Sequence, residues 1–184
     1  MSMKKTAAVL APLLAITSCA TSRGMADEDS KVLSAVVAQI CGQKSSGFAL
    51  LSSFSAAVSP GFTPSNLDES ARRSLLDRNR NPVPLPHLNT CESLRSANGK
   101  EIDSFLENPS LGGMPERWAA FYKRYVDANG VTWLSMPGYS ANGDWAVVQV
   151  SGACDYLCGS GFFWILHRVA GQWQVDRSIQ GWTS

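Results

Sequence analysis

The sequence predicts an α+β fold in which N-terminal helices pack on a C-terminal antiparallel meander sheet of about four strands. Apolar residues recur at helical spacing in three segments before residue 126. From Val131 the apolar period changes to that of strands, and turn residues separate four runs rich in Val, Trp, Phe and Ile. Helices followed by an antiparallel sheet are typical of the α+β class.

The N-terminus has the composition of a signal peptide. Lys4 and Lys5 precede an apolar stretch of about ten residues, and small residues surround Cys19. The stretch is too short to span a bilayer as a helix. We therefore expect a signal peptide, a lipid-attachment and tether segment, and a single α+β domain, at residues 1–18, 19–28 and 29–184.

Residues 16–19, with the sequence Ile-Thr-Ser-Cys, resemble the lipobox of bacterial lipoproteins. The resemblance implies cleavage before Cys19 and lipid attachment to that cysteine, so the membrane is an expected partner. Several acyl chains, at about 0.8 kcal/mol per buried methylene, hold a protein firmly at a membrane surface. A neutral residue after the cysteine, here Ala20, implies the periplasmic side of the outer membrane in a cell that has one. Ordinary secretory cleavage, which Ala26 also permits, instead predicts a soluble periplasmic or secreted protein.

The charge balance argues against nucleic acid as a partner. The chain has 16 basic and 15 acidic side chains, and no more than two basic residues are adjacent. Nucleic acids and anionic lipid surfaces select clustered Lys and Arg. Besides the membrane, the expected partner is therefore an envelope protein or a small ligand.

Four cysteines follow the signal region. An even number in an exported protein predicts two disulfides, for which three pairings are possible. We favour the pair Cys154 with Cys158, because these two are close along the chain, together with the pair Cys41 and Cys91.

A metal site and a thiol-redox site are the alternatives for Cys154 and Cys158. Structural zinc needs four thiolate or imidazole ligands, and this pair supplies half of such a site. His87 and His167 would have to complete it from distant positions, and His167 lies in an apolar strand pattern. Redox sites usually show C-x-x-C at a helix start, whereas here the spacing is C-x-x-x-C before a strand. We therefore expect no metal and no cofactor.

Three segments predict helices with one apolar face each. In residues 29–41 the apolar stripe recurs every three or four positions, and Gly42 ends the helix. Residues 68–78 follow the same pattern behind a capping Asn or Asp. After Pro115 an aromatic stripe favours core packing, with the lining of a ligand cleft as the alternative. The stripe consists of Trp118, Phe121, Tyr122 and Tyr125.

The second half predicts four strands, after one short strand at residues 48–53. Asn142 and Gly143 mark the first turn, the cysteine loop the second, and Ala170 and Gly171 the third. The four runs are residues 131–137, 145–151, 161–169 and 172–178.

The run at residues 161–169 is apolar on both faces. Its odd positions from Phe163 lie on one face and its even positions from Phe162 on the other. We therefore expect a central strand that is covered on both sides. Residues 172–178 alternate between apolar and polar, which predicts a half-exposed strand.

Five short motifs occur in a distinctive order: PVPL, W-x2-F-Y-x2-Y, C-x-x-L-C-G-x-G, G-x-W-x-V and a closing W-x-S. They lie at residues 82–85, 118–125, 154–161, 171–175 and 182–184. This order resembles a group of uncharacterised exported bacterial proteins whose loop often reads C-G-x-L-C-G. Asp155 stands here where that group often has Gly. The resemblance supports the α+β architecture and implies no activity.

The sequence carries none of the motifs that mark common catalytic and phosphate-binding sites. A G-x-S-x-G elbow, a G-x4-G-K-[ST] loop and a helix-opening G-x-G-x-x-G are all absent. We expect a lipid-anchored envelope protein that acts by binding rather than catalysis, with Asp155, Tyr156 and Leu157 as a candidate contact surface. The alternative is a small cell-wall-directed hydrolase that uses a carboxylate or His167.

Overall fold

The computed structural model describes residues 17–43 and 47–184, with side chains from Gly24 onward outside the gap, and over these residues the predicted α+β class is confirmed. The helices are α1 (Thr17–Cys41), α2 (Glu69–Arg78), α3 (Gly99–Leu106) and α4 (Met114–Arg124), with the 3-10 turns η1 (Pro60–Phe62) and η2 (Pro109–Leu111). The strands are β1 (Phe48–Ser52), β2 (Leu94–Ala97), β3 (Ala128–Leu134), β4 (Gly138–Tyr139), β5 (Trp145–Asp155), β6 (Cys158–Val169) and β7 (Gln172–Thr183).

The strands form one mixed sheet in the order β2-β1-β3-β5-β6-β7, and β4 pairs with β5. Strands β5, β6 and β7 are the predicted antiparallel meander. Two parallel strands, β1 and β2, extend the sheet beyond β3, so it is wider than the four strands expected. At the turn between β6 and β7, Ala170 and Gly171 both have positive φ, of 49° and 80°, which matches the right-handed twist of a two-residue hairpin.

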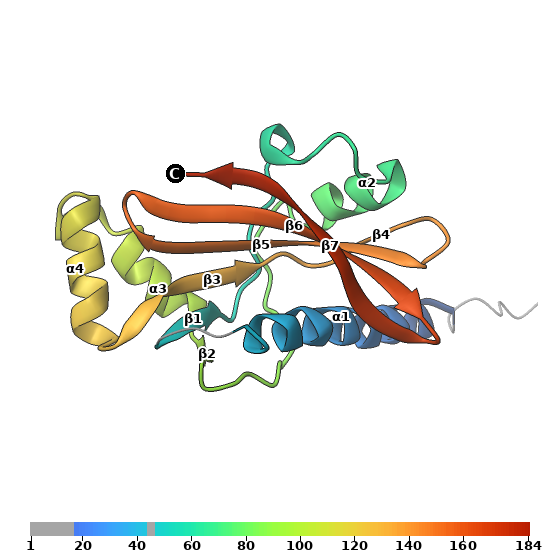
Figure 1. Ribbon diagram of the computed structural model, residues 1–184, viewed down its shortest axis with the longest axis horizontal. Coiled ribbons are helices and arrows are strands. Elements are labelled where there is room, and N and C mark those ends of the chain that lie inside the picture. The colour runs from blue at the N-terminus through green and yellow to red at the C-terminus, as the bar shows by residue number, and fades with distance from the viewer. Residues whose placement is uncertain (1–16, 44–46) are drawn as a thin grey trace, which may run out of the picture.

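Helix α1 covers one face of the sheet and ends before Gly42, as its sequence predicts (Figure 1). Its apolar stripe packs on strands β3, β5, β6 and β7. The stripe residues Val32, Leu33, Val36 and Val37 are all at most 2% exposed. Burial of such side chains contributes about 1.5–3 kcal/mol each, so this stripe holds the helix to the sheet.

The opposite face carries two separate cores. Helix α2 packs at one end against Val147, Phe163 and Ile165. Helices α3 and α4 pack at the other end on strands β1 and β3. The aromatic stripe of α4 lies in this second core, where Trp118 and Phe121 are buried. Strand β6 therefore has apolar cover on both faces, which confirms its predicted central position.

Residues 19–28, the expected lipid-attachment and tether segment, lie within α1, which begins at Thr17 and runs to Cys41 without a break. Extending a helix that already exists adds one hydrogen bond for each residue fixed, so growth beyond the packed stripe is inexpensive. Glu28 also fixes this part of the helix, since it accepts hydrogen bonds from Arg168, at 2.6 Å, and from Trp173, at 3.0 Å. None of the described helices is both long enough and apolar enough to cross a membrane.

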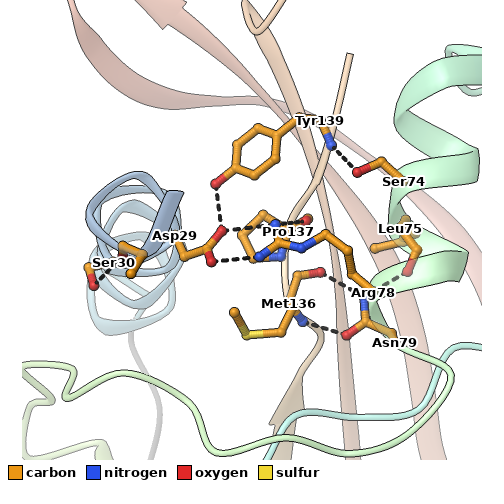
Figure 2. Close-up of polar contacts among 10 residues, drawn as sticks. Asp29, Ser30, Ser74, Leu75, Arg78, Asn79, Met136, Pro137 and Tyr139 are labelled. Atoms are coloured by element: carbon orange, nitrogen blue, oxygen red, sulfur yellow. Dashed lines mark hydrogen bonds and ion pairs between the residues drawn. The ribbon is translucent and has the colours of Figure 1, made fainter. Parts of the chain in front are cut away.

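A buried ion pair connects α1 to α2 and β4 (Figure 2). Both guanidinium nitrogens of Arg78 donate to the carboxylate of Asp29, at 2.6 and 2.9 Å, and Arg78 also donates to the carbonyl oxygen of Pro137. The hydroxyl of Tyr139 donates to Asp29 at 2.9 Å. The side chain of Asp29 is 7% exposed and that of Arg78 is 21% exposed. Because the carboxylate has three donors, its loss of hydration is compensated.

Replacing Arg78 with Met leaves Asp29 buried without its charge partner. We expect Arg78→Met to lower the free energy of unfolding by about 3–5 kcal/mol, measured by urea denaturation at neutral pH. Arg80→Met is the matched control, because the Arg80–Asp77 pair is exposed and its loss is expected to cost less than about 1 kcal/mol. Equal losses in the two variants would contradict the role given to the buried pair.

Candidate functional site

The structure contains two disulfides, which join Cys41 to Cys91 and Cys154 to Cys158. The first closes a sequence separation of 50 residues and ties the end of α1 to the segment before β2. Loop-closure entropy gives this bond about 4 kcal/mol of stabilisation and the small ring about 2 kcal/mol. Two disulfides indicate an oxidising, extracytoplasmic location.

The loop closed by Cys154 and Cys158 presents the predicted contact surface. Asp155, Tyr156 and Leu157 are all exposed, and Leu157 is 69% exposed. The hydroxyl of Tyr122 donates to the carbonyl oxygen of Cys154 and fixes the loop on α4. Burial raises the pKa of Tyr122, and the negative charge of Asp155 raises it further. The phenol therefore stays protonated and keeps this hydrogen bond at neutral pH.

Beside this loop lies a hollow of about 460 Å³ that is lined mainly by small side chains and by no charged one. Its lining includes the polar side chains of Asn129, Thr132 and Ser160 but no aromatic side chain, so it lacks the apolar wall that is usual in a small-molecule site. The predicted lipidation residue Cys19 lies among side chains outside those the structure describes.

A second hollow, of about 450 Å³, has a different lining. We call it the aromatic cleft, because four aromatic side chains line it: Phe54, Phe62, Trp133 and Trp182. The polar side chains of Gln149 and Ser151 also line it, and so do two carboxylates from α3. A mostly apolar wall with a few converging polar groups is the usual character of a small-molecule site.

The cleft lies between the two cores on the face of the sheet opposite α1. Alternate positions of β5 face this side, and they read Val147, Gln149, Ser151 and Ala153. Val147 packs in the α2 core and Ala153 against the α3–α4 core, so the polar pair falls between them. The sequence therefore places polar side chains where no helix covers the strand.

The strand register builds the two tryptophan walls. Across the sheet, Trp133 pairs with Ser151, Ser151 with Gly161, and Gly161 with Trp182. A Cβ atom on Gly161 would clash with the indole of Trp182, which therefore lies directly over this glycine. Ser151 and Gly161, in the middle of this row, are small and form the floor between the two indoles.

Gln149 is the least expected residue of the cleft. Its main chain is bonded to Ser135, but within the described part of the chain its side-chain amide has no hydrogen-bond partner. The residue is 7% exposed. Buried polar groups almost always have a partner, which is either protein, water or ligand.

Two acids stand at the cleft without a counter-ion. Asp103 and Glu107 lie four residues apart on α3 and its C-terminal cap, and no ion pair involves either of them among residues 17–43 and 47–184. Burial raises the pKa of Asp103, and the charge of Glu107 raises it further. The ammonium of Lys100 lies 5.6 Å from the centre of the Phe54 ring, and Arg117 donates to the carbonyl oxygen of Leu106, beside Glu107. Neither basic side chain lines the cleft. The cleft therefore carries net negative charge.

The predicted site residues and the cleft coincide only in part. His167 lies outside the cleft and stacks on Trp145, with 4.2 Å between the ring centres, and His87 is exposed in a loop. The cleft residues were not among the predicted site residues. The available signal was the polar pair Gln149 and Ser151 at alternate positions of an otherwise apolar strand.

No family model matches this chain, and neither a curated protein nor a solved structure is similar enough to count as a match. The assignment of the site therefore depends on its geometry and chemistry.

The raised pKa of Asp103 gives a pH-dependent prediction. Because the folded state holds the proton more tightly than the unfolded chain, this carboxyl group makes the protein less stable as pH rises above its ordinary pKa of 3.8. We expect Asp103→Asn to raise the urea midpoint of unfolding at pH 7 and to leave it unchanged at pH 3. Asp176→Asn, at an exposed strand position, is the matched control and should show no such gain. A gain of the same size at both pH values would contradict a cause in ionisation.

Proposed function

We propose that this protein is an exported, lipid-anchored binding module of the cell envelope that takes a small ligand in the aromatic cleft. The observation that carries the proposal is the amide of Gln149, which lines the cleft and has no hydrogen-bond partner in the described part of the chain, although the residue is only 7% exposed. In a cleft open to solvent, water is the partner of such a group until a ligand replaces it. The lipobox-like residues 16–19 and the two disulfides support the envelope location.

The lining of the cleft supports small-molecule binding more strongly than protein docking. Its volume of about 450 Å³ lies within the usual range of ligand pockets. Trp133 and Trp182 come from β3 and β7, which are fixed by the backbone hydrogen bonds of the sheet, and Phe54 follows β1 and forms a β-bridge with Pro84. The walls are therefore held in place before a ligand arrives, which lowers the entropy cost of binding.

A hydrolase is the second candidate, because Asp103 and Glu107 are carboxylates at the same cleft. Burial raises the pKa of Asp103, which is the direction required of a general acid. The two functions differ in what the acids do. A hydrolase loses turnover in Asp103→Asn and Glu107→Gln but still binds substrate, whereas a binding module shows no turnover in any form.

The cleft is tested with Gln149→Leu and a library of small polar and aromatic fragments. We expect fragments to shift the indole N–H resonances of Trp133 and Trp182 in the wild type and to lose this effect in the variant. We also expect Gln149→Leu to raise the midpoint of thermal unfolding by about 2–4 °C, because a polar side chain that is hardly exposed and has no partner in the protein is replaced by an apolar one of similar size. If Gln149→Leu is more stable than the wild type but binds the fragments more weakly, the glutamine is retained for binding at the expense of stability.

Gln174→Leu makes the same change at an exposed position of β7 and should alter neither property. Fragment binding that is absent from the wild type, or that persists fully in Gln149→Leu, would contradict the proposal.

The envelope location is tested by the intact mass of the protein from its native membrane fraction. We expect a chain that begins at Cys19 and carries the added mass of acyl groups, with four cysteines that react with iodoacetamide only after reduction. Cys19→Ser should release the protein from the membrane fraction. A soluble wild-type protein without acyl mass would show that cleavage follows the ordinary secretory route.

A further inference from the structure

We infer that the ligand of the aromatic cleft is a neutral glycan, whose rings stack on the tryptophans and whose hydroxyl groups bond to the polar side chains of the cleft. This inference rests on the proposed function and adds the chemical class of the ligand. Three features of the cleft carry it: the two indole walls, the donors and acceptors between them, and the uncompensated acids.

The indole walls match the shape of a sugar ring. Trp133 and Trp182 stand on β3 and β7, which the register places three strand spacings apart, or about 14 Å. Trp182 lies over Gly161, which narrows the opening from the β7 side. A sugar ring has C–H groups on its faces and hydroxyl groups around its edge. Aromatic faces bury the C–H surface of such a ring while its edge stays free to hydrogen-bond.

The polar groups of the cleft are best satisfied by a ligand that both donates and accepts hydrogen bonds. The amide of Gln149 offers two N–H donors and one acceptor, and the hydroxyl of Ser151 offers both functions. Asp103 and Glu107 accept when they are ionised. Sugar hydroxyl groups donate to carboxylates and accept from amides, so one ring edge can satisfy all these groups.

An organic cation satisfies only part of this set. It would pair with the carboxylates and lie against the aromatic faces. It would leave the two N–H donors of Gln149, a residue only 7% exposed, without an acceptor on the ligand. The donor and acceptor inventory therefore favours the glycan.

The charge of the cleft selects among glycans. Asp103 and Glu107 repel uronic acids and other anionic sugars, because a like charge brought into a partly desolvated site is unfavourable. Lys100 lies over the Phe54 ring and Arg117 is bonded to the carbonyl oxygen of Leu106, but neither forms an ion pair with these acids within the described residues. We therefore expect neutral oligosaccharides to bind and acidic ones to be excluded.

An oligosaccharide array tests the inference. It carries neutral glucan, mannan, galactan and N-acetylglucosamine oligomers beside acidic uronate oligomers, and it is probed with labelled wild-type protein and with three variants. We expect the wild type to bind at least one neutral series and no acidic series. Gln149→Leu and Trp182→Ala should each weaken the binding about tenfold or more. The control Trp145→Ala removes a partly exposed tryptophan outside the cleft and should bind normally.

The outcomes distinguish an error in the ligand class from an error in the proposed binding function of the cleft. Tetramethylammonium chloride and the fragment library are each added to the same protein while the indole resonances of Trp133 and Trp182 are followed. If these signals respond but no neutral glycan binds, the ligand class is wrong and the cleft remains a binding site. Binding of acidic oligosaccharides would overturn the charge argument. If neither glycans nor fragments bind, both proposals are wrong.

Discussion

The structure depends on a strand, β6, whose two faces are both apolar and must both be kept from water. Helix α1 covers the face that carries Trp164 and Leu166. On the other face, α2 covers Phe163 and Ile165. Burial of apolar side chains is the main favourable term in folding, so this requirement decides how the helices are arranged around the sheet.

The helices on the two faces are connected to each other by few polar contacts, and these are concentrated at one end of α1. Asp29 and Glu28 each bind a cation, Arg78 from α2 and Arg168 from β6. Apolar packing alone permits a helix to slide or rotate on a sheet by small steps, since it has no preferred direction. A buried carboxylate that accepts hydrogen bonds from three donors can accept all three only when its helix is in one position. The network of Asp29, Arg78 and Tyr139 therefore fixes the register of α1 on the molecule (Figure 2).

The aromatic cleft follows from the same arrangement, because two helical cores share one face of the sheet and do not meet. Most of the structure follows the rule that buried positions are apolar and polar groups are paired. The floor departs from it, because Gln149 and Ser151 are polar although each is only 7% exposed, and in the described part of the chain the neighbouring Asp103 and Glu107 form no ion pair. Such departures reduce stability and are retained where they serve binding or catalysis. The cleft is therefore a better candidate site than the loop closed by Cys154 and Cys158. Tyr156 and Leu157 in that loop are exposed, and such exposure does not place an unpaired polar group in the interior.

The sequence by itself determined the class of fold, the helix at residues 29–41, the C-terminal antiparallel meander and the two-sided burial of β6. These features depend on the period of apolar residues and on turn residues, which are local properties of the chain. The register that brings Trp133, Ser151, Gly161 and Trp182 into one row was decided only by the tertiary structure. So were the contact of Asp29 with Arg78 and the approach of Asp103 to the floor of the cleft. These depend on how strands pair and helices dock, and residues far apart in sequence meet there through packing that no local pattern encodes.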